Sequence, residues 1–293
     1  KPHGAENSRP IIAGAMLMTA CAAMGIAPTH RDVEFAKVGE HSLKLDVYLP
    51  KAEHPPLVVW IHGGAWRQGS KESMQIPGLI AHGFAIASVS YRLSPIEKFP
   101  AQVHDIKAAI RFLRATASDY GFDSSKIVIA GASAGGHLAA LVGVTNGHPE
   151  LEGKVGQHHE QSSDVQAIVD FYGPTNFMTI LKQSTPHGLG VRIPALQLLL
   201  RAQPEDVPEL AKLASPVSHV DGNDPPLLLI HGDQDPQVPI NQSHELHGEY
   251  KSTGLGDRVK LEVIHDGLHG GEPFYDEDRM KLVAEFLNEA LRD

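Results

Sequence analysis

Short apolar runs recur along the chain, and most are bounded by glycine, proline or polar residues. Five of them are almost continuously apolar, which is typical of strands that are buried on both faces of a parallel sheet. They lie at residues 57–61, 84–89, 127–130, 167–172 and 227–230, and a sixth strand with two polar positions is predicted at 259–264. The pattern therefore predicts a largely parallel sheet.

Between these runs the apolar residues return at helical spacing. The clearest case is 101–117, where Val103, Ile106, Ile110 and Leu113 fall on one side of a helix that follows Pro100. Further helices are predicted after the third run and at residues 242–250 and 277–291. Strands that alternate with helices indicate an α/β fold with a doubly wound sheet.

Two segments depart from this alternation. Residues 33–49 alternate loosely between apolar and polar positions around a turn at 39–41, which predicts an antiparallel strand pair at the edge of the sheet. Residues 174–218 are irregular, with an apolar patch at 196–200. Because ligands bind at the carboxyl ends of strands in such sheets, we interpret this second segment as a lid or cap over those ends.

The first 29 residues differ in composition from the rest. An uncharged apolar run at 11–27 follows Lys1 and Arg9, which predicts a secretory signal, and the residues before Cys21 loosely match a lipoprotein box. An N-terminal helix that packs on the domain is the alternative. We therefore expect a secreted or periplasmic protein, in contact with a membrane only if Cys21 is lipidated, with its catalytic domain at 30–293.

Charge and cysteine content narrow the classes of partner. The net charge is −10, from 25 basic and 35 acidic residues, and no cluster of lysine or arginine stands out, so a nucleic-acid partner is not expected. A single cysteine excludes an intrachain disulfide. Among the 18 histidines, His244 and His247 could share one helix face and bind a metal, but no metal or other cofactor is expected in the site.

A serine stands where the third apolar run meets its helix. The sequence from Gly131 to Gly135 has the form G-x-S-x-G, in which small residues permit a sharp turn that presents the serine hydroxyl above the sheet. Ser133 is therefore a candidate nucleophile. The alternative for this segment alone is an ordinary glycine-rich turn with a serine that caps the helix.

A serine nucleophile needs a base and an acid that orients the base. Asp233 and Asp235 both follow the fifth run, and we favour Asp235 because it lies further into the loop, whereas Asp233 suits a backbone turn. His269 follows the sixth run in a glycine-rich loop, and His265 at the strand end is expected to pack or face solvent. The order serine, aspartate, histidine is that of an α/β-hydrolase.

The loop after the first apolar run supplies candidate donors for an oxyanion. It reads His62-Gly63-Gly64-Ala65-Trp66, and its glycines allow the backbone to approach a substrate closely. We expect the amides of Gly64 and Ala134, together with that of Gly63, to stabilise the negative oxygen of a tetrahedral intermediate.

These motifs together resemble one known family. HGGAW, GASAGG, HGDQDPQVP and GLHGG, in this order, resemble the α/β-hydrolase carboxylesterases with an HGGxW oxyanion motif, and most of all the acetyl and feruloyl esterases of polysaccharide-degrading bacteria. The resemblance covers residue 33 to the end. It implies Ser133 as nucleophile, Asp235 as orienting acid and His269 as base, and it implies no cofactor. The substrate would be an ester of a short-chain acyl or feruloyl group, either a small molecule or linked to a polysaccharide.

The substrate pocket and the rival functions remain open at this point. Trp66 and Leu198 are candidate residues of the substrate pocket, and the oligomeric state is not predicted. Arylformamidases also carry an HGGxW loop and are the nearest alternative. A peptidase of the prolyl-oligopeptidase type shares HGxxDxxVP, but the chain has no room for its propeller domain. A catalytically inactive hydrolase fold that binds a ligand is the third alternative.

Overall fold

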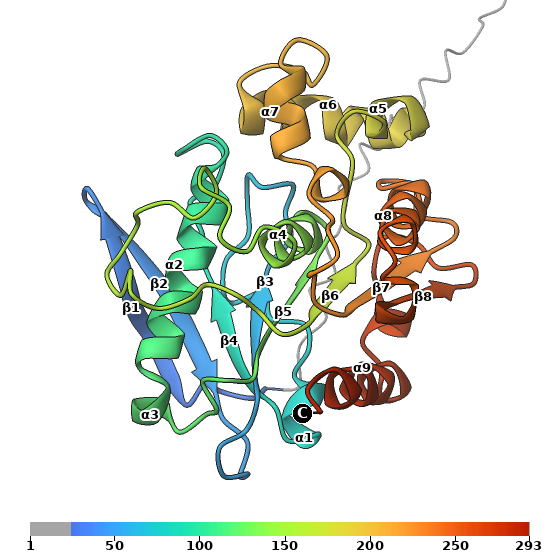
Figure 1. The fold of residues 1–293 in the computed structure, drawn as a ribbon. Coiled ribbons are helices and arrows are strands. Elements are labelled where there is room, and N and C mark those ends of the chain that lie inside the picture. The colour runs from blue at the N-terminus through green and yellow to red at the C-terminus, as the bar shows by residue number, and fades with distance from the viewer. Residues whose placement is uncertain (1–24, 293) are drawn as a thin grey trace, which may run out of the picture.

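One eight-stranded sheet organises the computed structural model, which describes residues 25–292 (Figure 1). The spatial order of the strands is β1-β2-β4-β3-β5-β6-β7-β8. Strands β3 to β8 run parallel, and β1 and β2 form an antiparallel hairpin that pairs with β4. The strands are β1 (His30–Val38), β2 (His41–Tyr48), β3 (Leu57–Ile61), β4 (Ala85–Val89), β5 (Ile127–Ala132), β6 (Ile168–Phe171), β7 (Leu227–Gly232) and β8 (Val259–Ile264).

Helices cover both faces of this sheet (Figure 1). The helices of the described residues are α1 (Gly78–Ala81), α2 (Ala101–Ala115), α3 (Ala117–Tyr120), α4 (Ala134–Gly143), α5 (Ile180–Gln183), α6 (Pro186–Leu200), α7 (Pro208–Leu213), α8 (Asn241–Ser252) and α9 (Glu277–Ala290). Three short 3-10 helices are η1 (Pro216–Ser218), η2 (Gly256–Arg258) and η3 (Glu272–Phe274).

Alternate side chains of the central strands enter two separate cores. Leu57 and Val59 of β3 join the core shared with α2, α4 and α8, whereas Val58 and Trp60 join the core formed with α1 and α9. Every residue of β3 is buried, because a strand in the middle of a doubly wound sheet has a helix layer on each side. The predicted α/β class, the mostly parallel sheet and the antiparallel edge hairpin are confirmed.

The segment 174–218 differs from the irregular conformation that its sequence predicts. It contains α5, α6, α7 and η1, and the three α-helices gather at the top of the molecule in Figure 1, beyond the strands. Helix α6 starts at Pro186 after Thr185, whose hydroxyl accepts a hydrogen bond from Gly188 N at 3.0 Å, and it includes Pro194. Prolines and glycines hide the helical pattern here, and packing of the buried side chains stabilises the helix instead.

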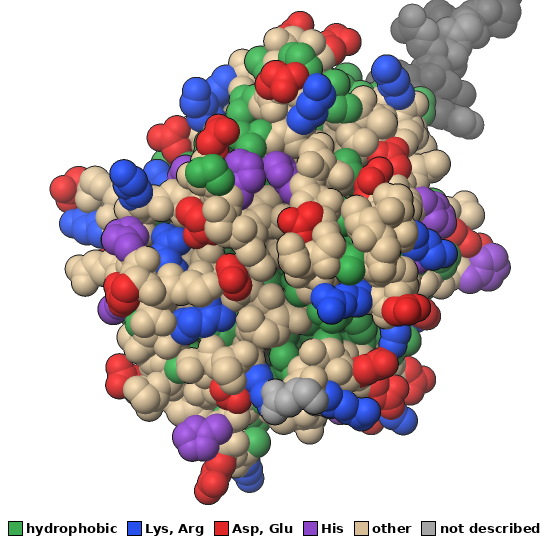
Figure 2. Space-filling view, viewed as in Figure 1, with side chains coloured by type: hydrophobic (Ala, Val, Ile, Leu, Met, Phe, Trp, Pro, Cys, Tyr) green, Lys and Arg blue, Asp and Glu red, His purple; other side chains and the backbone are tan. Residues whose placement is uncertain are grey.

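The predicted export segment lies mostly outside the described residues, which begin at residue 25, so the signal, the lipoprotein box and Cys21 stay predictions. Within residues 25–292, every helix is too short or too polar to cross a lipid bilayer. On the face shown in Figure 2, acidic and basic side chains are interspersed, and neither sign gathers into a broad patch.

Candidate active site

Ser133 occupies a sharp turn between β5 and α4. Its backbone torsions are φ 55° and ψ −118°, a conformation that few residues with a side chain adopt. Glycine at position 135 lets the turn pack against β3, because a Cβ atom there would lie 2.0 Å from the Ile61 carbonyl oxygen. Ser133 makes no capping hydrogen bond to α4, in contrast to the alternative of a structural cap, so its hydroxyl is free for another partner.

The hydroxyl of Ser133 lies at the end of a chain of hydrogen bonds. His269 Nε2 is 2.9 Å from Ser133 Oγ, and His269 Nδ1 is 2.7 Å from Asp235 Oδ2. The three residues follow β5, β7 and β8, whose carboxyl ends lie at one edge of the parallel sheet. The structure thus brings together the serine, histidine and aspartate that the sequence singles out.

Asp235 has further polar partners besides His269. Its Oδ1 accepts hydrogen bonds from the amides of Gln237 and Val238, at 2.8 and 2.9 Å, and His231 lies 3.4 Å from its Oδ2. Burial raises the pKa of the Asp235 carboxyl, but these partners and His269 outweigh burial and hold the pKa below its usual range. A charged Asp235 accepts from His269 Nδ1, which leaves Nε2 free to accept the serine proton.

The glycine loop after β3 lies against the serine turn. A Cβ atom on Gly63 would lie 3.4 Å from the Cβ of Ser133 and 2.8 Å from the Ala132 carbonyl oxygen. Within residues 25–292, the amides of Gly63 and Gly64 donate to no protein acceptor, and that of Ala134 is the first of α4, where helix amides lack an intrahelical partner. Unpaired amides beside the serine are suited to an oxyanion.

Aromatic contacts hold this loop in place. The His62 ring stacks on Tyr91 with centroids 4.4 Å apart, and its Nδ1 donates to Gly63 O at 2.7 Å. The Tyr91 hydroxyl donates to the His62 carbonyl at 3.0 Å. Burial lowers the pKa of His62 to about 4, so the ring is neutral at physiological pH.

Trp66 connects the loop to the segment 174–218 rather than lining an open surface. Its side chain is fully buried, and its Nε1 donates to His137 Nδ1 at 3.1 Å, while His137 Nε2 donates to the Ala214 carbonyl at 2.7 Å. The ring also packs edge-on against Phe177. Leu198, on α6, is half-buried. Contact of Trp66 or Leu198 with a substrate stays a prediction.

One aromatic residue of the site, Tyr172, is not predicted by the sequence motifs. Tyr172 follows β6 directly with a positive φ of 46°, and its ring packs edge-on against His269 with centroids 4.7 Å apart. Its hydroxyl pairs with that of Tyr275. Tyr172 therefore restricts the orientation of the histidine ring. The signal that could have identified it is its place at a strand end of the same sheet edge.

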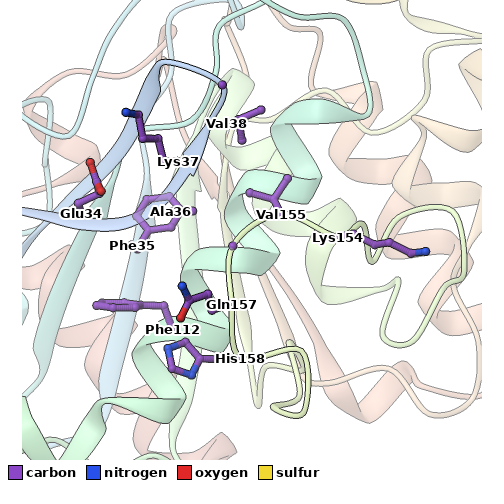
Figure 3. A pocket seen from close by; sticks show the side chains of 12 residues that line it. Glu34, Phe35, Ala36, Lys37, Val38, Phe112, Lys154, Val155, Gln157 and His158 are labelled. Atoms are coloured by element: carbon purple, nitrogen blue, oxygen red, sulfur yellow. The ribbon is translucent and has the colours of Figure 1, made fainter.

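Two other clusters lie away from the triad. Asp233, His265 and Asp266 offer ligand atoms close enough for one metal ion, yet His265 is largely exposed and hydrogen-bonds Asp233 at 3.0 Å, as its position at the strand end predicts. A surface pocket lies between β1 and residues 154–158, at the opposite edge of the sheet from β8 (Figure 3). No triad residue lines this pocket.

The mostly parallel sheet, the strained serine turn and the order of the acid and histidine define an α/β-hydrolase fold. Comparison with known protein families identifies the family within this fold to which the chain belongs. The chain belongs to the BD-FAE family, whose model matches residues 45–250.

Three proteins that this chain resembles carry the name esterase. Esterase LipC of Mycobacterium tuberculosis is 32% identical over 262 residues, which cover 85% of this chain and 62% of LipC. A truncated carbohydrate esterase from gut microbiota superposes with a TM-score of 0.80 at 33% identity, over 89% of this chain and 95% of that one. Esterase 2 of Thermogutta terrifontis, phosphonylated by sarin, gives a TM-score of 0.75 at 27% identity, over 89% and 95%. The chain spans about three fifths of the length of LipC and of its relative LipQ.

Proposed function

We propose that the protein is a serine carboxylic ester hydrolase that acts through a Ser-His-Asp triad and an acyl-enzyme. The observation that carries the proposal is the continuous hydrogen-bond chain from Ser133 through His269 to Asp235, next to amides without protein partners. Membership in the BD-FAE family and similarity to esterases support the same reaction class.

In the proposed reaction, Ser133 Oγ attacks the carbonyl carbon of the ester while His269 Nε2 accepts its proton. The amides of Gly63, Gly64 and Ala134 donate to the oxyanion that forms. His269 then gives the proton to the leaving alcohol as the carbon–oxygen bond breaks, and the acyl group stays on the serine. Water, deprotonated by His269, attacks the acyl-enzyme, which releases the acid and restores the serine hydroxyl.

Reaction with a fluorophosphonate probe tests this proposal directly. The probe should form one covalent adduct at Ser133, which peptide mass spectrometry would locate, because only an activated serine displaces the fluoride at a useful rate. A chain that binds substrate esters without adduct formation and without turnover would instead be an inactive hydrolase fold. In that case the proposed function is wrong.

We propose short-chain acyl esters, acetyl above all, and feruloyl esters as the substrate class. The support is the similarity to a carbohydrate esterase from gut microbiota. A panel of 4-nitrophenyl esters of increasing chain length, methyl ferulate and acetylated xylan would rank the candidates by kcat/KM. Turnover of N-formylkynurenine above every ester in the panel would favour the arylformamidase alternative and contradict the ester assignment.

We also propose that the protein is exported, on the basis of the apolar run at 11–27 behind a basic start. Fractionation of cells that express the full chain should recover it outside the cytoplasm. Substitution of Cys21 by alanine separates the two modes of export. Only a lipid-anchored form would move from the membrane fraction to the soluble fraction.

A further inference from the structure

Segment 174–218 carries a buried arginine that the proposed mechanism does not use. Arg192 lies on α6 with 1% of its surface exposed, and two nitrogens of its guanidinium, Nε and Nη1, are buried without a hydrogen-bond partner. A buried charge without hydrogen bonds is unfavourable, so such groups are nearly always paired with an acceptor. Among residues 25–292, Nε and Nη1 of Arg192 have no acceptor.

The position of Arg192 relates it to the active site. Its guanidinium carbon is 5.3 Å from the centroid of the Trp66 ring, which follows the glycine loop. One helical turn earlier, Gly188 contacts the loop of Asp235, because a Cβ atom there would lie 3.1 Å from the carbonyl oxygens of Pro236 and Gln237. Residues four apart share one helix face, so Arg192 lies on the face of α6 that contacts the Asp235 loop, and its guanidinium lies beside Trp66.

The charges around Arg192 favour an anion from outside the protein. Burial lowers the pKa of Arg192 to about 10, the Asp235 carboxylate opposes this effect and Arg67 adds to it, so the guanidinium is charged at neutral pH. The oxygens of Asp235 already accept from His269 and two amides. None of the ion pairs of residues 25–292 includes Arg192 or Arg67. Arg192 therefore pairs with no carboxylate of residues 25–292, and the nearby Asp235 carboxylate is already occupied.

We propose that Arg192 binds a carboxylate group carried by the ester substrate. A guanidinium presents parallel N–H donors that match the two oxygens of a carboxylate. The inference rests on the proposed ester hydrolysis and specifies its substrate. The carboxylate belongs either to the acyl part, as in a monoester of a dicarboxylic acid, or to the alcohol part, as in an acetylated uronic acid.

Matched substrate pairs test the proposal. One pair is mono-4-nitrophenyl glutarate and its neutral methyl ester, and the other is acetylated glucuronic acid and its methyl ester. The full-length protein should favour the charged member of one pair, and the pair that shows the preference identifies which part carries the carboxylate. Arg192→Met should lower the charged-to-neutral ratio of kcat/KM by about 10- to 100-fold, and Arg192→Lys should lower it less.

The control is Arg201→Met at the exposed end of the same helix, which should leave the ratio as it is in the unsubstituted protein. A purely structural role for Arg192 would change both members of each pair alike and leave the ratio constant. Equal ratios in the unsubstituted protein and in Arg192→Met, with neutral esters still hydrolysed, would overturn the carboxylate site and leave the proposed function standing.

A binding measurement separates the two proposals further. Calorimetric titration of Ser133→Ala with glutarate does not depend on turnover. Binding that Arg192→Met weakens at least tenfold would support the carboxylate site even if no ester were hydrolysed. Binding that the substitution leaves unchanged would place the anion elsewhere and contradict the inference.

Discussion

Ser133 combines a strained backbone with a partly exposed hydroxyl. A positive φ at a residue with a side chain costs about 1–3 kcal/mol, and here the flanking strand and helix hold the residue in this conformation. Its amide donates to the Phe171 carbonyl at 2.8 Å, which fixes the turn on β6. The reactive group is therefore oriented before any substrate arrives.

Replacement of Ser133 by alanine removes only the hydroxyl oxygen of this residue. We expect hydrolysis of 4-nitrophenyl acetate to fall by at least about 10³-fold, because the nucleophile is lost while the amides and His269 remain. Circular dichroism and thermal unfolding should match the unsubstituted protein. Hydrolysis that persists in a folded Ser133→Ala variant would show that another group attacks the ester.

Asp235 contributes its charge and its geometry to His269. In Asp235→Asn the amide could donate where the carboxylate accepts, which favours the wrong tautomer of His269, so kcat should fall by about 10⁴-fold. The matched control is Asp233→Asn, two residues earlier, whose side chain pairs with His265 and not with His269. Steady-state kinetics on a 4-nitrophenyl ester would compare them. A similar kcat for both variants would remove Asp235 from its assigned role.

At the scale of elements, α4 contacts the end of β3 more closely than any side chain permits. Gly135 lies in the first turn of α4, against the carbonyl oxygens of Ile61 and His62, where a Cβ atom would lie 2.0 and 2.6 Å away. Both neighbours are backbone atoms of the strand end that leads into the glycine loop. The helix, the serine turn and the loop therefore form one unit.

Gly135→Ala should disrupt the packing of α4 and the serine turn against the glycine loop. The methyl group collides with backbone that cannot rotate away, so we expect a loss of at least about 3 kcal/mol in the free energy of unfolding. Gly248→Ala in α8 is the matched control, because its added Cβ meets no atom within 4 Å and alanine favours a helix. Urea unfolding of both variants gives the comparison. Equal stability would contradict the close contact.

The sequence predicts the strands well, because their hydrophobic pattern depends only on whether one or both faces of the strand are buried. Continuous apolar runs produce the parallel strands, and the alternation at 33–49 produces the edge hairpin, because burial on two faces or on one leaves different periods. The triad residues could be identified for a related reason. Strands that run parallel bring their carboxyl ends to one edge, so loop residues far apart in the chain meet there.

Residues whose position depends on packing between distant elements could not be predicted. Helix α6 contains Pro186 and Pro194, which obscure its helical pattern in the sequence. Which of its residues are buried depends on its contacts with Trp66 and with the Asp235 loop. Arg192 on that face looks like an ordinary surface residue in the sequence. Tyr172 likewise gains its contact with His269 only once β6 and β8 are placed in the same sheet.

At the scale of the whole molecule, buried histidines and a buried aspartate have opposite effects on how the stability of the fold depends on pH. Burial lowers the pKa of His62 and His137 to about 4 and raises the pKa of Asp170 to about 7. Between pH 4 and 6.5 the unfolded chain binds more protons at the histidines, so their contribution to stability falls as the pH falls. Asp170 acts in the opposite direction, because the folded state holds its proton more tightly.

His137→Gln should show how much His137 contributes to the loss of stability at low pH. Glutamine can accept from Trp66 and donate to Ala214 but does not titrate, so the loss of stability between pH 6.5 and 4 should shrink by up to about 3 kcal/mol. Denaturant unfolding at a series of pH values measures it, with the exposed His244→Gln as control. A variant whose pH slope equals that of the control would refute a buried neutral His137.

The chain order of the triad also bears on synthesis. Ser133 and its strained turn are complete once β5, α4 and β6 have been made, but the base that pairs with the serine follows the last strand, 136 residues later. During synthesis, Ser133 is therefore made well before its base, because segment 174–218, β7 and β8 come between them. If the proposed mechanism holds, hydrolytic activity requires β8 and the loop after it, so a polypeptide that ends before His269 should have none.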